Sequence, residues 1–221
     1  MRLSSLTIVA ATLFVSVITI EAAETAIIPL AKSGEYGTFE KLDAKGRPVG
    51  WSAPPTGFSI VEKDGNHWLR GKNSNPKEAP GMNLVLDVPQ GTDGINLSAK
   101  MRVANVKQGE KYWEIPRIML VFKNADGKAV GGYPAKLPDV KRSDWQNLTM
   151  FRKVPEGAVE LTVTPHILRS TGVLEVDDIS VTPSSALGVP YELPKNRRLF
   201  WGEEKVETLS ATRAEMVLNG L

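Results

Sequence analysis

The chain of 221 residues contains no cysteine and only two histidines, His67 and His166. The lack of cysteine excludes disulfide scaffolds, cysteine-based zinc sites and thiol catalysis. Two histidines leave little for a histidine-based triad or metal centre. The net charge is only +2 and there is no dense run of lysine and arginine, which argues against a nucleic-acid binder.

Catalytic signatures are also missing. The sequence has no G-x-S-x-G motif, no glycine-rich phosphate loop and no H-E-x-x-H motif. A glycosidase needs two carboxylates placed across a cleft, and the spacing of the acidic residues does not pair any two of them. We therefore do not predict an enzyme.

The residues that are present indicate one globular β domain. With 42% hydrophobic and 24% charged residues, the chain can build a full core. Short apolar runs alternate with turn clusters, and no long amphipathic helix interrupts them, which predicts an antiparallel sandwich or barrel. The expected strands are Phe58–Glu62, His67–Gly71, Met82–Asp87, Ile95–Val103, Pro116–Lys123, Trp145–Lys153, Val159–His166 and Gly172–Val181.

Alternation assigns a face to the side chains of three of these strands. The residues expected to point into the core are Leu97, Ala99, Met101, Val103, Ile118, Leu120, Phe122, Leu161, Val163 and Pro165. Those expected on the opposite faces include Lys100, Arg102, Arg117, Met119, Val121, Thr162, Thr164 and His166. These outward sets suit a sheet that faces solvent or a ligand.

The stretch VLEVDDISVTP, Val173–Pro183, organises the rest of the chain. Strict alternation places Glu175, Asp177 and Ile179 on one face, and apolar residues fall on both faces, which predicts a central strand. Because unpaired buried charge is very costly, the acids need a neutralising group. A bound cation, an arginine, or a position near the strand's end that reaches solvent would each satisfy them.

The first 23 residues are typical of a signal peptide. Arg2 is followed by the apolar run Leu6–Ile20, and Ala22-Ala23 offers small residues for cleavage. The run is shorter than the roughly 20 residues of a membrane-spanning helix, although a retained anchor is the alternative. We expect a secreted or periplasmic protein that has no membrane contact after cleavage.

The character of the sequence changes again near its C-terminal end. We place the β domain at residues 34–184 and a linker with a tail at residues 185–221. Leu218-Asn-Gly-Leu221 resembles the opening of the sugar-binding domain that starts family two glycoside hydrolases. The tail is therefore interpreted as the possible start of a truncated downstream domain.

An ordered set of short motifs resembles a known family. The motifs are Phe39-Glu40, Pro48-Val-Gly-Trp51, Leu97-Ser-Ala-Lys-Met-Arg102, Arg117-Ile118, Asp126-Gly127, Asp144-Trp145, Val154-Pro-Glu-Gly-Ala158 and Val176-Asp-Asp-Ile-Ser-Val181. Together they resemble the carbohydrate-binding modules of families 4, 9 and 22, in the galactose-binding-like superfamily. The resemblance covers about residues 34–183 and implies an all-β jelly-roll sandwich.

The resemblance also implies a structural Ca²⁺ that joins the first segment to the last strand. The matching positions are Glu40 and Asp177, with the backbone carbonyl near Thr38 and the Asp64–Asn66 turn as further donors. Oxygen ligands of this kind are what Ca²⁺ requires. The family often has asparagine where this chain has Glu35 or Tyr36. In the alternative reading, Asp177 caps a turn or pairs with an arginine.

Sugar binding requires flat aromatic faces and polar groups that contact hydroxyls. We expect Tyr112 and Trp113 to form the aromatic platform, with Arg102, Arg117 and His166 beside it. A tryptophan at a loop–strand junction can instead be a hydrophobic lid, and His166 can be a solvated surface residue. Trp145 and Trp51 are expected to be structural, and Trp145 is placed in the core.

The function predicted from the sequence is that of a secreted, non-catalytic carbohydrate-binding module. Its partner would be a polysaccharide or oligosaccharide, to which it would direct an attached or lost glycoside hydrolase. The alternative is an interaction or structural module of the cell envelope that does not bind sugar. A third reading, a β-sandwich hydrolase or lyase, has the least support. Nothing in the pattern indicates an oligomeric state.

Overall fold

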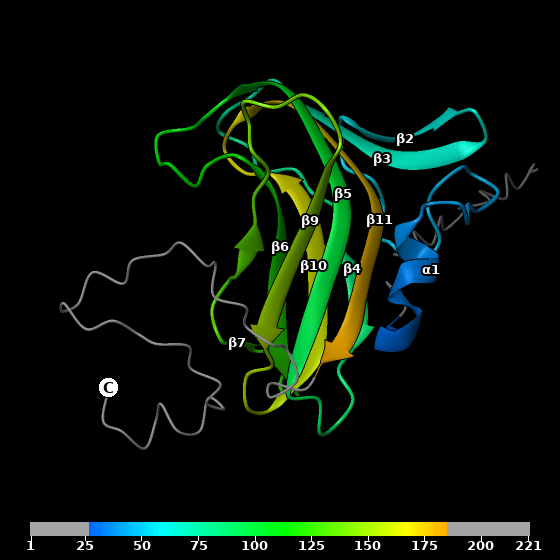
Figure 1. The fold of residues 1–221 in the computed structure, drawn as a ribbon, viewed down its shortest axis with the longest axis vertical. Helices are drawn as coiled ribbons and strands as arrows, with labels where there is room; N and C mark the ends of the chain where they lie inside the picture. Colours follow the sequence, from blue (N-terminus) through cyan, green and yellow to red (C-terminus); the bar gives the residue numbers. More distant parts are fainter. Residues whose placement is uncertain (1–26, 185–221) are drawn as a thin grey trace, which may run out of the picture. The chain divides into compact units, whose positions relative to one another are not determined.

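The computed structural model describes residues 27–184, which form a sandwich of two β-sheets (Figure 1). One sheet has the order β1-β4-β10-β6-β7, with β8 also pairing with β6, and the other has the order β2-β3-β11-β5-β9. The strands of the first sheet are β1 (Ile28–Pro29), β4 (Leu84–Asp87), β10 (Ala158–Ile167), β6 (Pro116–Asn124), β7 (Ala129–Val130) and β8 (Ala135–Lys136). Those of the second are β2 (Phe58–Lys63), β3 (Asn66–Asn73), β11 (Thr171–Ser184), β5 (Gly94–Lys107) and β9 (Gln146–Lys153). All pairings are antiparallel except that of β1 with β4.

The core lies between the two sheets and follows the alternation of the sequence. Leu97, Met101, Ile118, Leu120 and Leu161 are at most 1% exposed. Each of the eight expected strands is present, with bounds that differ by a few residues, because every one combines an apolar face with a turn at each end. The jelly-roll sandwich predicted from the sequence is therefore confirmed.

β11 is the middle strand of its sheet, as predicted, but its two faces differ from the simple alternation. The pairing with β5 shifts register between Asp177 and Ser180, and Asp178 has a φ of 51°. This bulge turns the strand by one residue, so Leu174 and Val176 share the core with Ile179 and Val181. Glu175 and Asp177 point away from the core, and the predicted alignment of Ile179 with them is wrong.

A short N-terminal segment joins the free edge of β11 beyond β3. It consists of a 3₁₀ turn, η1 (Leu30–Lys32), and one helical turn, α1 (Ser33–Gly37). The Ser33 hydroxyl donates to Val181 O and accepts from Val181 N, both at 2.8 Å. The expected closeness of the first segment to the last strand is thus confirmed, and Figure 1 shows α1 beside β11.

The expected signal peptide and the linker with its tail lie outside the described residues. Between residues 27 and 184, no helix is long and apolar enough to cross a membrane.

Candidate functional site

The loop between β5 and β6, residues 108–115, carries two exposed aromatic side chains. It closes through hydrogen bonds from Gly109 N to Glu114 O at 2.9 Å and from Glu114 N to Lys111 O at 2.8 Å. Tyr112 is 78% exposed and Trp113 39% exposed, and their rings meet edge to face with centroids 5.0 Å apart. Lys111 Nζ lies 5.1 Å from the centre of the Trp113 ring. Figure 1 shows this loop projecting from the upper left of the molecule.

The same loop forms a wall of a cavity of about 590 Å³. Its lining combines residues from three connections: Pro76, Lys77, Gln108, Gly109, Glu110, Glu114 and Arg169. Glu114 is buried, with Oε2 accepting from Lys111 N at 3.0 Å and Oε1 lying 3.7 Å from Arg169 Nη1. The cavity therefore offers both cationic donors and carboxylate acceptors, in a volume typical of small-ligand sites. We call Tyr112, Trp113 and this cavity the loop site.

Arg117 and His166 lie next to the loop site, as a directly paired couple in β6 and β10. They point away from the core as predicted, yet only 7% of Arg117 and 5% of His166 is exposed. Gly81 bridges to His166, so that a Cβ at Gly81 would come within 2.5 Å of the His166 Cβ. The reading of His166 as a solvated surface residue is therefore wrong, because the backbone around Gly81 covers it.

Burial dominates the electrostatics of this couple. It lowers the pKa of His166 to about 4, and the neighbouring charge of Arg117 acts in the same direction. Burial also lowers the pKa of Arg117, against the opposing effect of Glu114. Within the part of the chain that the structure describes, Arg117 Nη2 and His166 Nε2 are buried without a hydrogen-bond partner. A neutral histidine and a constrained guanidinium thus lie behind the loop site.

Arg102 is not part of this group, because it lies on the outer face of the other sheet. Its Nε donates to Glu175 Oε2, and Arg70 Nη2 lies 2.6 Å from Glu175 Oε1. Arginines therefore neutralise Glu175, which was one of the alternatives left open for the acids of this strand. Four of the five predicted ligand residues thus lie at one end of the sandwich, and Arg102 does not.

Trp145 is also on this outer face and not in the core, so that prediction is wrong. It immediately precedes β9, is half-buried, and packs against Arg102, whose Cζ lies 4.7 Å from the ring centre. Trp51, by contrast, is buried as expected, with its ring centre 5.1 Å from that of Phe39.

The two carboxylates of the predicted calcium site lie near the start of β3. Glu40 accepts from His67 N at 2.9 Å and contacts His67 Nδ1 at 2.6 Å, and these hydrogen bonds lower its pKa. Asp177 accepts from the Asn66 amide at 3.1 Å, and burial raises its pKa. Thr38 contacts Glu35 O through its hydroxyl. Among residues 27–184 no three His, Cys, Asp or Glu side chains cluster in a way that could hold a metal, and the calcium site stays a prediction.

Several residues of the loop site were not predicted, namely Lys77, Glu110, Glu114 and Arg169. They come from separate connections, and no spacing in the sequence indicates that these connections meet. One local signal was available for the loop itself, since Gly109 allows the close approach of Arg169 O and the Glu114 side chain.

Comparison with known proteins identifies the fold. No protein-family model matches the chain, and no curated protein matches it. Among solved structures, the enzymatically active domain of tailspike protein 4 of bacteriophage CBA120 matches with a TM-score of 0.50 and 11% identity. That match covers 72% of this chain and 22% of the tailspike chain, so this chain spans less than a quarter of it.

Other similar structures are carbohydrate-binding modules. A family 4 module matches with a TM-score of 0.43 and 14% identity, over 67% of this chain and 97% of that one. The N-terminal xylanase 10B of Clostridium thermocellum, a family 22 module joined to a family 10 glycoside hydrolase, matches with a TM-score of 0.42 and 16% identity. The match covers 68% of this chain and 28% of the xylanase. The described part of the chain has the fold of a two-sheet jelly-roll β-sandwich.

Proposed function

We propose that this chain binds carbohydrate without transforming it, and that the loop site is where it does so. The observation that carries the proposal is the exposed Tyr112–Trp113 pair on a loop that also walls a polar cavity. The jelly-roll fold and the sequence resemblance to carbohydrate-binding modules support the same class of ligand.

The chemistry of the loop site suits sugar rings. The apolar face of a pyranose stacks on an aromatic ring, and Tyr112 presents most of its ring to solvent. Sugar hydroxyls both donate and accept hydrogen bonds. Lys77 and Arg169 can donate to them, Glu110 can accept from them, and Gln108 can do both.

The contacts of Glu114, one of the two carboxylates that line the cavity, support the non-catalytic part of the proposal. A glycosidase needs one acid and one base or nucleophile facing the same bond. Glu114 is buried, and its two oxygens face the Lys111 amide and the Arg169 guanidinium. That carboxylate positions the loop and is not free to attack or protonate a substrate.

The wider role that we propose is targeting. A secreted or periplasmic module would hold an attached or lost glycoside hydrolase on its polysaccharide. Two sequence features support this role: the signal-peptide pattern, and the resemblance of Leu218–Leu221 to the opening of the sugar-binding domain that starts family two glycoside hydrolases. A structural Ca²⁺ at Glu40 and Asp177 belongs to the same proposal.

A glycan panel tests the proposal. The full chain is screened against soluble and insoluble glycans, and the best-bound one is titrated into wild type, Trp113→Ala and the control Tyr133→Ala. Tyr133 is 67% exposed but lies in the connection between β7 and β8. We expect Trp113→Ala to weaken binding about tenfold or more, roughly 1.4 kcal/mol, at an unchanged melting temperature, and Tyr133→Ala to bind as wild type does.

Two results would overturn the proposal. If no glycan binds, the chain is an interaction module and not a sugar binder. If a glycan binds equally to wild type and to Trp113→Ala, the loop site is not where it binds.

A further inference from the structure

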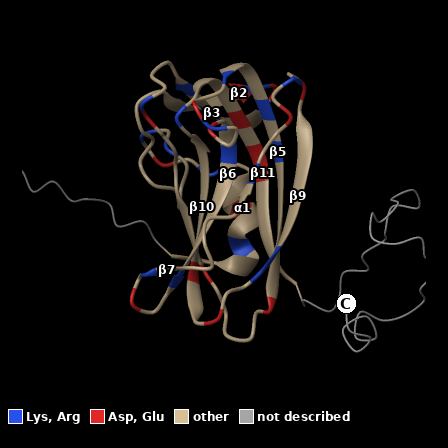
Figure 2. Cartoon of the chain, turned by 90° about the vertical axis from the view of Figure 1, so that its left-hand side faces the viewer, with Lys and Arg blue, Asp and Glu red and all other residues tan. Residues whose placement is uncertain are grey.

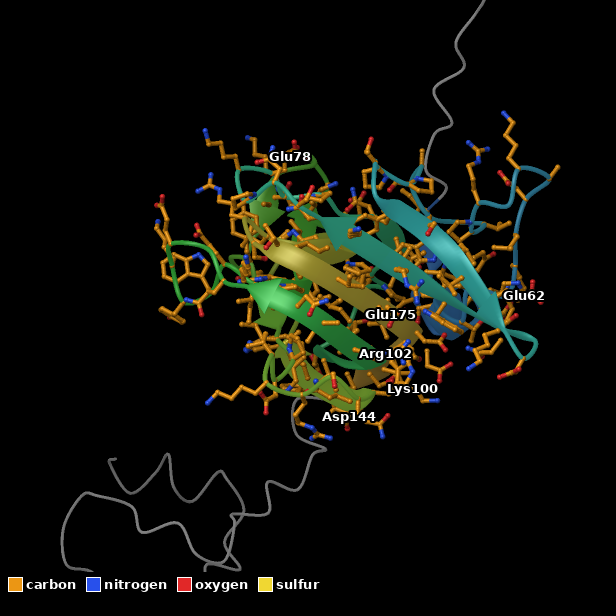
Figure 3. The ribbon with its side chains drawn as sticks, turned by 90° about the horizontal axis from the view of Figure 1, so that it is seen from above. Glu62, Glu78, Lys100, Arg102, Asp144 and Glu175 are labelled. Carbon is orange, nitrogen blue, oxygen red and sulfur yellow. The ribbon has the colours of Figure 1, made fainter. Side chains whose placement is uncertain are left out.

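The outer face of the β2-β3-β11-β5-β9 sheet carries a compact group of five side chains at its centre. None of the five belongs to the loop site. We call Trp68, Arg70, Arg102, Trp145 and Glu175 the Glu175 cluster. Figure 2 shows acidic residues on β11 beside basic residues on β5, and Figure 3 shows Glu175, Arg102 and Lys100 following one another along this face. The register explains the arrangement, since Glu175 pairs with Arg70 on one side and Arg102 on the other.

Glu175 is the centre that orients the other members. Its Oε1 accepts from Trp68 Nε1 at 2.9 Å and from Arg70 Nε at 2.8 Å, while Oε2 accepts from Arg102 Nε. Burial acts to raise its pKa, but the hydrogen bonds from Arg102, Trp68 and Arg70 outweigh burial, and the pKa is lowered. Glu175 therefore stays ionised and holds two guanidinium groups with one carboxylate.

The aromatic rings fix Arg102 further. Trp68 and Trp145 meet edge to face with centroids 6.2 Å apart, and the Arg102 guanidinium lies over Trp145. Trp68, Trp145, Arg102 and Glu175 thus form a closed ring of contacts. Such a ring removes most of the rotamer freedom that an arginine would otherwise lose on binding a ligand.

Some of the donors of the two arginines remain unused. Arg102 engages Glu175 only through Nε, and Arg70 only through Nε and Nη2. No contact within residues 27–184 occupies either terminal nitrogen of Arg102 or Nη1 of Arg70 by a hydrogen bond. The side chains are 30% and 44% exposed, so these nitrogens can reach a ligand.

The local charge favours an anion. Two arginines face one carboxylate, and Lys72, exposed on the same face of β3, has no ion-pair partner in the described part of the chain. The nearby Lys100 and Arg142 are paired with Asp178 and Asp144, so they leave the excess positive charge unchanged. Asp177, a further acid on this face, accepts from the neutral amide of Asn66, so its charge reduces the positive excess without removing it.

We infer that the Glu175 cluster is a second glycan site and that it binds a polysaccharide of uronic acids. The guanidinium fork matches a carboxylate, and the Trp145 ring beside it offers an apolar surface for the sugar. The strands that carry Arg70 and Arg102 lie two strand spacings apart, roughly 10 Å. Both guanidinium groups converge on the Glu175 carboxylate, so their free nitrogens face the same stretch of a bound polysaccharide. The inference rests on the proposed function for the class of ligand only, because the two sites lie on different sheets.

The experiment compares two polymers and several variants of the full chain. Polygalacturonate and the best neutral glycan are titrated at low and at high salt. The variants are Arg70→Gln, which leaves Glu175 paired with Arg102, and Arg102→Lys, which keeps the charge but removes the planar fork. Lys128→Gln is the matched control, since Lys128 is exposed at the turn between β6 and β7.

We expect polygalacturonate to bind wild type and to be weakened at least tenfold by Arg70→Gln, by Arg102→Lys and by high salt. Lys128→Gln and Trp113→Ala should leave this binding unchanged. Polygalacturonate binding that persists when no neutral glycan binds would support the Glu175 cluster and reject the loop site.

The inference is overturned if folded wild type does not bind polygalacturonate at low salt, or if both arginine variants bind it as wild type does. Equal loss in Lys128→Gln would indicate attraction by net charge alone. Equal binding of a single-stranded oligonucleotide would show a general polyanion surface and would overturn the assignment to uronic acids.

Discussion

His166 and Arg117 are two polar side chains that the fold buries beside the loop site. His166 has no hydrogen-bond partner for Nε2 in the structure of residues 27–184, and it sits directly opposite Arg117. A charged imidazole at this position would be desolvated and repelled by the guanidinium. The neutral form is therefore the one that the folded protein holds.

This burial predicts a loss of stability in mild acid. The pKa of His166 is about 4 in the folded chain, against roughly 6.5 unfolded, so the unfolded state takes up the proton first. The stabilisation is fully present above about pH 6.5, declines below it, and is lost as the pH falls through 4. We expect His166→Gln to be less sensitive to acid than wild type over this range, by up to about 3 kcal/mol.

Urea unfolding followed between pH 7 and pH 4 measures this difference. If wild type and His166→Gln lose stability in parallel as the pH falls, folding does not lower the pKa of His166.

At the residue scale, alternation predicts which way a side chain points but not what covers it. The outward direction of Arg117 and His166 was correct, while the burial of His166 depends on Gly81, some 85 positions earlier in the chain. Trp145 shows the converse: a large aromatic near a strand start is expected in the core, but the register with Met101 at the next residue, Gln146, turns it outward. Neither the burial of His166 nor the outward direction of Trp145 can be predicted from the neighbouring sequence.

At the scale of elements, the joint between α1 and β11 is built around a glycine. A Cβ at Gly37 would lie 1.8 Å from Ile179 O, next to the bulge of β11. Gly34, one turn earlier on the same helix, would place its Cβ 3.4 Å from the Ser180 hydroxyl, an ordinary contact. Of these two positions, only Gly37 brings the helix into close contact with the backbone of β11.

We expect Gly37→Ala to destabilise the protein by about 1–3 kcal/mol or more, because the backbone carbonyl of Ile179 cannot move freely within the sheet. The matched variant Gly34→Ala should be neutral or slightly stabilising, since alanine favours a helix. Thermal unfolding of both variants measures the effect. Equal melting temperatures for the two would mean that α1 does not pack against β11 as described.

The predicted calcium site lies near the start of β3, where Glu40 contacts His67 and Asp177 contacts Asn66. If Glu40 and Asp177 share a Ca²⁺, the ion binds the folded state only, and added Ca²⁺ raises the melting temperature while a chelator lowers it. Asp177→Ala should abolish this response, and Asp144→Ala, at an exposed pair with Arg142, should keep it. A melting temperature that is the same with Ca²⁺ and with chelator would reject the site.

The strands were predictable and the bulge was not. Each strand has an apolar face that reads directly from the sequence, but the left-handed φ of Asp178 leaves no trace in the pattern of apolar residues. Aspartate tolerates this conformation better than most residues, which makes the DD pair a weak indication in retrospect. The short elements β1, β7, β8 and α1 were missed because two to five residues carry too little periodicity.

At the scale of the whole molecule, the sandwich separates two surfaces of different chemistry. One end carries the loop site, with exposed aromatics and a cavity of mixed charge. The outer face of the second sheet carries the Glu175 cluster, with a buried acid between two arginines. The fold follows from periodicity, but both sites are assembled from connections and strands that only the tertiary structure brings together.

Mapping a bound oligosaccharide on the full chain is the sharpest test of sugar binding at the loop site. Amide NMR signals are followed while the best-bound neutral oligosaccharide of the glycan panel is added. We expect saturable shifts confined to residues 108–115, Lys77 and Arg169. Shifts confined to other parts of the sandwich, or no shifts at saturating sugar, would contradict it.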